Sequence, residues 1–239
     1  MEARPRPAAH GASGSFGRMT EILIADDHPL FRDALQRAVQ QALPQAQVHG
    51  VESIGALLAL LERHAQADLL LLDLHMPGAH GYSALAHIRG HYPELPVMVV
   101  SAHEEALVAR RALAHGAVAY VPKSAAGGEI AQAIRAVLEG GLWLPPRLRE
   151  ERAEFKAGEA EVAARIAQLT PQQFRVLGMI AAGLLNKQIA FELGVSEATV
   201  KAHMTAIMRK LGVNNRTQVA LAANQLAVEP SPLPPEIAE

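Results

Sequence analysis

The sequence predicts an α/β protein in which a doubly wound, five-stranded parallel sheet is followed by a small all-α domain. In residues 19–145, five short apolar runs alternate with five segments of helical periodicity, which is typical of a parallel sheet. Residues 169–225 carry helical patterns only. Charge divides the chain in the same way. Residues 20–145 hold eight Lys/Arg and thirteen Asp/Glu, a net −5, whereas residues 165–225 hold seven Lys/Arg and two Asp/Glu, a net +5.

The apolar runs and the helical segments between them define the expected elements. Strands are expected near residues 21–25, 47–51, 68–73, 96–101 and 117–121, and helices near residues 29–43, 53–64, 81–91, 104–115 and 126–139. Pro44, Gly116 and Gly140 interrupt the periodicity between elements. Because a helix separates each pair of consecutive strands, the strands should run parallel with helices on both faces, as in a flavodoxin-like fold.

Composition sets the expected domain boundaries. Residues 1–18 are rich in Arg, Pro, Gly, Ser and Ala and are expected to be a disordered leader. The α/β domain then spans 19–145, and the charged residues 146–168 are expected to form a partly helical linker. The helical domain spans 169–225, and the proline-rich residues 226–239 are expected to be a disordered tail.

Composition also argues against several classes of protein. No apolar stretch approaches the roughly eighteen residues that suggest a membrane span, and residues 1–18 lack the apolar core of a secretory signal. The chain has no cysteine, which rules out disulfides and thiolate chemistry. We therefore expect a cytoplasmic protein with no membrane partner.

Charged side chains follow three of the predicted strands. Asp26 and Asp27 end the first strand, Asp73 ends the run Leu69–Leu72, and Lys123 follows the fifth strand. Because the carboxyl ends of parallel strands meet at one edge of a sheet, these groups should lie close together. Three adjacent carboxylates repel one another unless a divalent cation neutralises them, and Mg²⁺ takes oxygen ligands and pairs with phosphate.

This arrangement predicts a phosphoryl acceptor. Asp73 would be the nucleophile that takes a phosphoryl group as an acyl phosphate, and Asp26 and Asp27 would hold Mg²⁺. Lys123 would pair with the phosphoryl oxygens, and the Ser101 hydroxyl, at the end of the fourth strand, would donate a hydrogen bond to them. Any one of these residues alone is compatible with a helix cap or a solvated strand end. All of them in this order and spacing indicate chemistry.

The helical residues contain a helix–turn–helix pattern. A helix ending near Leu193 is followed by Gly194, and Ser196 is the expected N-cap of a second helix over residues 197–210. On that helix the apolar Val200, Met204, Ile207, Met208 and Leu211 recur at helical spacing, opposite Lys201, Ala202, Thr205 and Arg209. Such a helix can lie in the major groove of DNA. A small helical bundle with solvated basic residues is the alternative, and the net charge of the segment disfavours it.

The α/β residues resemble a known family. Residues 20–141 are similar to the receiver domain of bacterial two-component response regulators, and the matching residues are Asp26, Asp27, Asp73, Ser101, Tyr120 and Lys123, with Pro77-Gly78 after the acceptor. The resemblance implies that a sensor histidine kinase supplies the phosphoryl group and that the backbone carbonyl of His75 joins the Mg²⁺ ligands. It also implies that Tyr120 swings inward on phosphorylation. Beyond self-transfer and slow autodephosphorylation, the protein is not expected to be an enzyme.

Two histidines border the predicted pocket. His75 and His103 lie two residues past Asp73 and Ser101. The resemblance implies that these positions tune dephosphorylation, because both can contact the attacking water. Two alternatives are that they are solvated loop residues, or that they attract a transition metal.

The helical residues resemble the LuxR-type DNA-binding domain. The matching stretches are Leu169-Thr170-Pro171, Gly183-Leu184, Asn186-Lys187, Ile189-Ala190, Leu193-Gly194-Val195-Ser196, Thr199-Val200-Lys201-Ala202-His203, Lys210-Leu211-Gly212-Val213 and Asn215-Arg216-Thr217-Gln218. Together the two resemblances place the chain in the NarL/FixJ class of response regulators. Three positions depart from the usual pattern: Gln173 replaces an acidic residue, Leu185 a small polar residue, and Gln188 a glutamate.

The second resemblance also implies contacts with double-stranded DNA. Bases would be approached by Lys201, Ala202 and Thr205, phosphates by Asn186, Lys187, Thr199, His203 and Arg216, and Arg209 completes the DNA-binding set. Because Ala202 and Thr205 are small, base readout should be modest and should need a dimer that reads two half-sites.

Opposite charges on the two halves suggest a switch. Phosphorylation adds about −1.5 to −2 charge units at Asp73. The helix over residues 197–210 is the expected recognition helix, the one that would enter the DNA groove. We hypothesise that the acidic receiver covers this basic helix until phosphorylation separates the two and promotes a homodimer. RNA polymerase is a candidate further partner.

Three other functions fit parts of the sequence. A phosphatase or mutase with a strand-end aspartate would need a second acid two residues on, where His75 stands. A nucleotide- or flavin-binding fold would need a Gly-rich phosphate loop after the first strand, where Asp26 and Asp27 stand. A receiver joined to a protein-interaction module is the third alternative, and salt-dependent binding to duplex DNA would exclude it.

Overall fold

The computed structural model describes residues 19–148 and 158–228. The first of these segments forms a parallel sheet with strand order β2-β1-β3-β4-β5. Its strands are β1 (Glu21–Ala25), β2 (Gln47–Val51), β3 (Leu69–Asp73), β4 (Val97–Ser101) and β5 (Ala119–Pro122), and its helices are α1 (Pro29–Ala42), α2 (Ile54–Arg63), α3 (Ser83–His91), α4 (Ala106–Ala114) and α5 (Gly127–Leu138). The predicted doubly wound five-stranded fold is confirmed.

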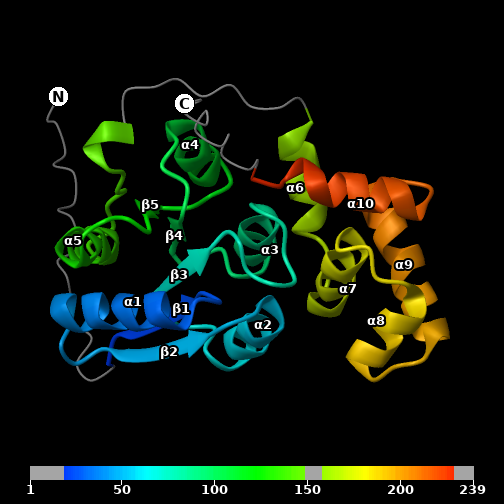
Figure 1. The fold of residues 1–239 in the computed structure, drawn as a ribbon, viewed down its shortest axis with the longest axis horizontal. Helices are drawn as coiled ribbons and strands as arrows, with labels where there is room; N and C mark the ends of the chain where they lie inside the picture. Colours follow the sequence, from blue (N-terminus) through cyan, green and yellow to red (C-terminus); the bar gives the residue numbers. More distant parts are fainter. Residues whose placement is uncertain (1–18, 149–157, 229–239) are drawn as a thin grey trace, which may run out of the picture.

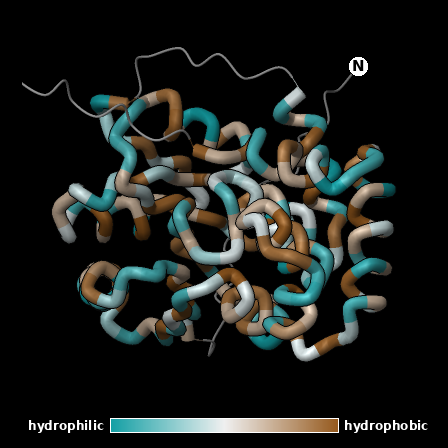
Figure 2. The backbone as a smooth tube through the Cα atoms, turned by 45° about the vertical axis from the view of Figure 1, so that its right-hand side comes forward, coloured by the Kyte–Doolittle hydropathy of each residue, from teal (hydrophilic) through white to brown (hydrophobic). Residues whose placement is uncertain are grey.

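Helices cover both faces of the sheet (Figure 1). Successive residues of a strand point to opposite faces, so Ile22 and Ile24 pack beneath α1 and α5, whereas Leu23 and Ala25 pack beneath α2, α3 and α4. In Figure 2, hydrophobic and hydrophilic residues alternate along the helices, as expected for helices that are buried on one side. Every residue of β3 is buried, which explains its unbroken leucine run.

The second described segment is helical. Its elements are α6 (Glu159–Ile166), α7 (Pro171–Ala181), α8 (Asn186–Leu193), α9 (Glu197–Leu211) and α10 (Arg216–Gln225), and a short 3₁₀ turn (Pro146–Leu148) precedes them at the end of the first segment. Thr170 and Gln173 form a capping box at the start of α7, and Ser196 caps α9 by accepting a 3.1 Å hydrogen bond from the Thr199 backbone N–H. None of the helices within the described ranges is long and apolar enough to cross a membrane.

Two predicted boundaries need correction. The expected linker at 146–168 is helical in part, but Glu159, Ala163 and Ile166 of α6 are buried, so residues 158–168 belong to the folded helical half. The charged composition of the segment obscured this apolar stripe. Residues 149–157 and the predicted leader at 1–18 lie outside the described residues.

The predicted disordered tail also begins too early. Leu226 is fully buried and Val228 is 8 % exposed, and the Leu226 carbonyl accepts a 2.8 Å hydrogen bond from the Tyr82 backbone N–H. These two apolar residues complete the core beside α3, which the proline count of the tail could not indicate. The remainder of the predicted tail, residues 229–239, lies outside the described part of the chain.

The two halves share one hydrophobic core on the α2–α3–α4 face of the sheet. Their backbones approach so closely at two helical glycines that a side chain would not fit. A Cβ atom on Gly178 of α7 would collide with the Gly78 carbonyl oxygen, and one on Gly90 of α3 would collide with Ala167 after α6. The halves therefore pack in one specific, interlocking arrangement.

Candidate functional site

The carboxyl ends of β1, β3 and β5 bring the predicted charged residues together. Lys123 Nζ lies 2.7 Å from Asp26 Oδ2 and 2.8 Å from Asp73 Oδ2. Ligand atoms of Asp26, Asp27, His28 and Asp73 all lie within 4.8 Å of one another. Asp26 and Asp73 are at most 2 % exposed, whereas the Asp27 side chain is 27 % exposed and the His28 side chain 66 % exposed, so the cluster is buried on one side and open to solvent on the other.

The Lys123 ammonium holds two buried carboxylates at once. Burial disfavours the charged form of Lys123, but the hydrogen bonds with Asp26 and Asp73 outweigh this effect and raise its pKa above the ordinary value. The ammonium also lies 4.9 Å from the centre of the Phe31 ring. Lys123 therefore stays a cation throughout the neutral pH range.

The donor set fits a divalent cation. Asp26 Oδ2 and Asp27 Oδ1 are both buried carboxylate oxygens. Each has a cationic or potentially cationic neighbour at 2.7 Å, Lys123 and His28 respectively. Buried carboxylate oxygens in this state can ligate Mg²⁺, which prefers oxygen donors. The backbone N–H of His75 donates a 3.1 Å hydrogen bond to Asp73 Oδ1, so this backbone borders the acceptor.

Ser101 ends β4 and Tyr120 lies in β5, next to the strands and loops that carry Asp73 and Lys123. Ser101 is fully buried, and its Oγ accepts a 3.3 Å hydrogen bond from the His103 backbone N–H. Tyr120 is also fully buried and donates a 2.8 Å hydrogen bond to the His103 carbonyl. Its pKa is raised well above the ordinary value by burial, which a hydrogen bond with Ser101 offsets only in part. Tyr120 is thus held in a buried position beside the loop that carries His103.

His75 and His103 form one wall of a pocket of about 440 Å³ above Asp73. Their rings stack with centroids 5.0 Å apart and an interplanar angle of 27°. His75 is exposed on its outer side, but the His103 side chain is only 10 % exposed and its Nδ1 lies 3.2 Å from Glu105 Oε2. Partial burial lowers the pKa of His75. The alternative that both histidines are solvated loop residues thus fits His75 but not His103.

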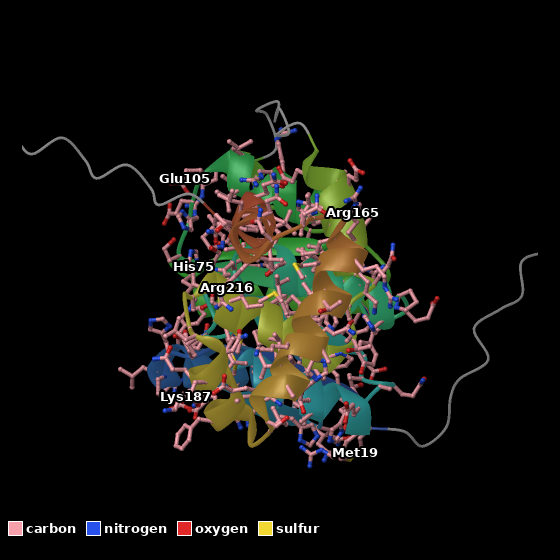
Figure 3. The ribbon with its side chains drawn as sticks, turned by 90° about the vertical axis from the view of Figure 1, so that its right-hand side faces the viewer. Met19, His75, Glu105, Arg165, Lys187 and Arg216 are labelled. Carbon is pink, nitrogen blue, oxygen red and sulfur yellow. The ribbon has the colours of Figure 1, made fainter. Side chains whose placement is uncertain are left out.

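The recognition helix predicted from the sequence is α9. Val200, Met204, Ile207 and Leu211 are buried, and Met208 is half-buried, as the periodicity predicts. The opposite face is open to solvent and carries Lys201, Ala202, Thr205 and Arg209. Figure 3 shows α9 crossing the side of the molecule that faces the viewer, with the labelled Lys187 and Arg216 near it. Its polar face is therefore free to meet DNA.

Several predicted phosphate contacts already have partners inside the protein. Arg216 donates a 3.0 Å hydrogen bond to Asn186 Oδ1 and a second, short one to the Leu184 carbonyl. The hydroxyl groups of Thr199 and Ser196 are hydrogen-bonded at the α9 cap. Lys187 is exposed and His203 is half-buried. Arg216 and Asn186 therefore join α10 to the start of α8, whatever contact they make with DNA.

The three departures from the usual pattern lie at helix starts. Gln188 Oε1 accepts a 2.7 Å hydrogen bond from the Leu185 backbone N–H, and Gln173 Oε1 accepts a 3.1 Å bond from the Thr170 N–H. The neutral amides thus satisfy helix-terminal donors, as a glutamate would. Leu185 itself is exposed.

Comparison with known proteins identifies both halves. The family model for the response regulator receiver domain matches residues 22–135, and the model for bacterial regulatory proteins of the luxR family matches residues 167–223. A glycerol metabolism activator of Pseudomonas putida is 39% identical over 213 residues, covering 87% of this chain and 96% of its own length. The chain belongs to the NarL/FixJ class of response regulators.

Other response regulators match most of the chain. The nitrate/nitrite response regulator protein NarL of Escherichia coli K12 is 33% identical over 207 residues, covering 85% of this chain and 94% of its own length. A structure of the RcsB response regulator of Salmonella enterica serovar Typhimurium, bound to the promoter P1flhDC with the phosphomimetic BeF₃⁻, is 25% identical. It covers 88% of this chain and all of that chain, with a TM-score of 0.52. The present response regulator is thus a DNA-binding transcriptional regulator with a receiver domain.

In this structure the receiver does not cover the recognition helix, in contrast to the arrangement hypothesised for the unphosphorylated protein. Receiver helices α2 and α3 contact α7 and α6 respectively, while the polar face of α9 stays exposed. The interface buries apolar side chains from both domains. Apolar area determines such packing, and the attraction between domains of opposite net charge is screened beyond about 8–10 Å. Charge was therefore a poor guide to the contact surface.

His87 of α3 was missed as an interdomain residue. Its fully buried ring stacks on Phe174 of α7, with centroids 4.3 Å apart and an interplanar angle of 7°. Burial lowers the pKa of His87 to about 3, so the ring is neutral at physiological pH. Nothing in the sequence distinguishes this histidine from an ordinary helix residue, because its partner lies 87 residues further along the chain.

A buried ionic cluster between the domains was also missed. Glu159 Oε1 of α6 accepts a 2.9 Å hydrogen bond from Arg111 Nε of α4 and lies 2.6 Å from His115 Nε2. Burial favours the neutral acid, but the hydrogen bonds with His115 and Arg111 outweigh it and lower the pKa of Glu159. Arg111 also lies 4.7 Å above the Tyr82 ring. Receiver helix α4 is thereby tied to the DNA-binding half.

Proposed function

We propose that the protein is a phosphorylation-switched transcription factor. A sensor histidine kinase would phosphorylate Asp73, and the modified receiver would promote a homodimer that reads paired half-sites in double-stranded DNA. One observation carries this proposal: the loop that follows Asp73 touches the DNA-binding half through the Gly78–Gly178 contact. Acting on DNA, the protein would work in the cytoplasm.

The chemistry proposed for Asp73 is one phosphoryl transfer. A carboxylate oxygen attacks the phosphorus of the kinase phosphohistidine, an O–P bond forms, and the N–P bond breaks with its electron pair returning to the imidazole. Asp26 and Asp27, with Asp73 and the His75 backbone carbonyl, would hold Mg²⁺, which when bound would neutralise phosphoryl charge. Lys123 already contacts Asp73 and would turn to the phosphoryl oxygens.

Ser101 would supply the second contact to the phosphoryl group. Its hydroxyl is buried at the end of β4, where it accepts a 3.3 Å hydrogen bond from the His103 backbone N–H and is also hydrogen-bonded with Tyr120. Rotation of that hydroxyl would disturb the backbone of His103, which donates to Ser101 and whose carbonyl accepts a hydrogen bond from Tyr120. Self-transfer and slow autodephosphorylation are the only reactions proposed, so the protein is not an enzyme in the ordinary sense.

The route from Asp73 to the DNA-binding half runs through its own loop. The Pro77 carbonyl accepts a 3.2 Å hydrogen bond from the Ile54 backbone N–H at the start of α2, and Gly78 abuts α7. A shift of residues 74–78 would therefore disturb the packing of α2 and α7 together. We propose that this shift changes how the DNA-binding half is held, and that the homodimer and any contact with RNA polymerase follow from it.

Selection of genomic DNA fragments tests the proposal. The purified protein would be presented with fragments with and without beryllofluoride and Mg²⁺. Enrichment of paired half-sites that depends on the mimic, and that is lost in Asp73→Asn, is the expected result. Equal enrichment in both states would contradict the switch, and no enrichment in either state would favour a protein-interaction module.

A further inference from the structure

A second cluster of metal-ligating side chains lies at the other end of the sheet. Glu21 begins β1, His49 lies in the middle of β2, and His64 caps the C-terminal end of α2. Asp26 follows the opposite end of β1, so this cluster is separate from the phosphoryl-acceptor pocket. In Figure 3 the labelled Met19, two residues before Glu21, lies far from the labelled His75 beside Asp73.

The three side chains converge on a single point. Glu21 Oε1 lies 2.7 Å from His64 Nδ1 and 3.1 Å from His49 Nε2. The two imidazole rings are 4.3 Å apart at 40°, and all three ligand atoms lie within 4.8 Å of one another. The three side chains are 18–24 % exposed, so the cluster is accessible to an ion but partly sheltered.

The backbone holds these donors in place. Glu21 is fixed by the parallel ladder with β2 and by its N–H, which donates a 2.8 Å hydrogen bond to Asp68 Oδ2. His49 sits inside the same ladder, opposite Leu23. The His64 N–H donates a 2.9 Å hydrogen bond to the Leu60 carbonyl at the end of α2. Donors placed on rigid elements form a site with little ordering cost.

The chemistry of the donors selects the ion. Two imidazoles and one carboxylate suit Zn²⁺ and similar borderline transition metals, whereas Mg²⁺ and Ca²⁺ prefer oxygen donors alone. Ligands about 2.0–2.2 Å from a tetrahedral Zn²⁺ lie roughly 3.3 Å from one another. The Glu21–His64 distance of 2.7 Å is about 0.6 Å shorter than this and the Glu21–His49 distance of 3.1 Å about 0.2 Å shorter, so a small outward movement of the side chains would admit an ion.

We propose that Glu21, His49 and His64 form a binding site for a Zn²⁺-like transition-metal ion, with a fourth position left for water. The ion would join the C-terminal end of α2 to β1 and β2. The other end of α2 contacts Pro77 in the loop after Asp73, and α2 packs against α7. A metal at this site would therefore stiffen an element that links the receiver to the DNA-binding half.

Titration of the untagged, chelator-treated full-length protein with Co²⁺ tests this site. Excess Mg²⁺ would occupy the acidic pocket, and Co²⁺ would report its coordination through visible absorption. The expected result is one Co²⁺ per chain with intense four-coordinate bands, displaced by Zn²⁺. Glu21→Gln and His64→Gln should each weaken binding by about tenfold or more.

The control variant removes the stacked imidazoles of His75 and His103, which lie near the Glu105 carboxylate. His75→Gln combined with His103→Gln should leave the Co²⁺ spectrum and stoichiometry unchanged. Equal Co²⁺ binding by wild type and the Glu21→Gln/His49→Gln/His64→Gln variant would overturn the proposal, and so would no binding at micromolar Co²⁺. If that variant is poorly folded, Zn²⁺ titration of the wild-type protein followed by imidazole NMR decides. Ring signals of His49 and His64 must then shift together, and their failure to shift would overturn the site.

Discussion

At the scale of single residues, the receiver pocket depends on one ammonium between two buried carboxylates. Lys123 contacts both Asp26 and Asp73, and its raised pKa shows that this pairing outweighs the cost of burial. The same residue thus stabilises the pocket and, in the proposed function, would also contact the phosphoryl group. Structural and chemical roles coincide here because unpaired buried charges are costly.

Lys123→Gln should lower the free energy of unfolding by about 3 kcal/mol without Mg²⁺, because it leaves two buried carboxylates facing each other. Millimolar Mg²⁺ should restore more stability to the variant than to the wild type, since the ion would replace the lost cation. Urea unfolding with and without Mg²⁺ measures both effects. An equal response of the two proteins to Mg²⁺ would argue against metal ligation by these carboxylates.

His87 should make the domain interface sensitive to acid. The ring titrates at about 3 in the folded protein and near 6.5 when unfolded, so the unfolded chain binds more protons between those values. The contribution of the neutral His87 ring to the free energy of unfolding is therefore fully present above pH 6.5. It falls as the pH drops toward 3, by up to about 1.4 kcal/mol per pH unit. His87→Phe, which keeps the stack on Phe174, should lose this component of the slope. His91→Gln, at an exposed neighbour, should retain it in the same urea titrations.

At the scale of elements, α7 and α9 have separate tasks. The capped helix α7 faces the receiver at Gly178, whereas α9 buries one side and presents Lys201 and Thr205 to solvent. Helix α10 is held to α8 by Arg216 and Asn186. The element that contacts the receiver and the element proposed to contact bases are therefore different helices of one small domain.

Gly178→Ala should loosen the domains without weakening α7. Alanine favours a helix over glycine by about 1 kcal/mol, but its Cβ would meet the Gly78 carbonyl and cost about 1–3 kcal/mol of docking. Small-angle X-ray scattering should show a larger radius of gyration. Gly128→Ala in α5, where a Cβ has open space, is the matched control and should match the wild type. An unchanged profile for Gly178→Ala would show that the contact does not hold the domains.

Lys201→Ala on α9 should weaken DNA binding and make it less dependent on salt. Loss of one cation from the DNA interface should reduce the slope of log K against log salt by up to about 0.9. Arg135→Ala removes the same charge from the exposed face of α5 and should leave the slope unchanged. Fluorescence anisotropy over a series of salt concentrations compares the two variants, and identical slopes would remove Lys201 from the DNA interface.

At the scale of the whole molecule, the two domains pack together without covering the recognition helix. The Glu159 cluster joins α4 to α6 and the His87–Phe174 stack joins α3 to α7, whereas the exposed polar face of α9 takes part in neither contact. A packed state of this kind does not need to open before α9 meets DNA. Control by phosphorylation would then act on the pairing of two molecules and on how the DNA-binding halves are oriented.

Binding to DNA with one or two half-sites distinguishes control of dimer formation from a mechanism in which the receiver covers α9. We expect wild-type affinity for a single half-site to be nearly the same with and without beryllofluoride, because α9 is exposed in the packed molecule. Affinity for two correctly spaced half-sites should rise by at least about tenfold with the mimic, since a dimer reads both. A similar rise on the single half-site would instead show that phosphorylation uncovers α9.

The sequence by itself determined the sheet, the acidic pocket and the buried side of α9. Asp26, Asp73 and Lys123 follow strands that must end at one edge, so local patterns were enough to bring them together. How the domains meet was decided only in the tertiary structure. The burial of Glu159 and Leu226, the stacked His87 and the exposed polar face of α9 all depend on apolar surfaces and glycine contacts from distant parts of the chain. Periodicity and net charge are local or averaged quantities, and neither specifies which surfaces are complementary in shape.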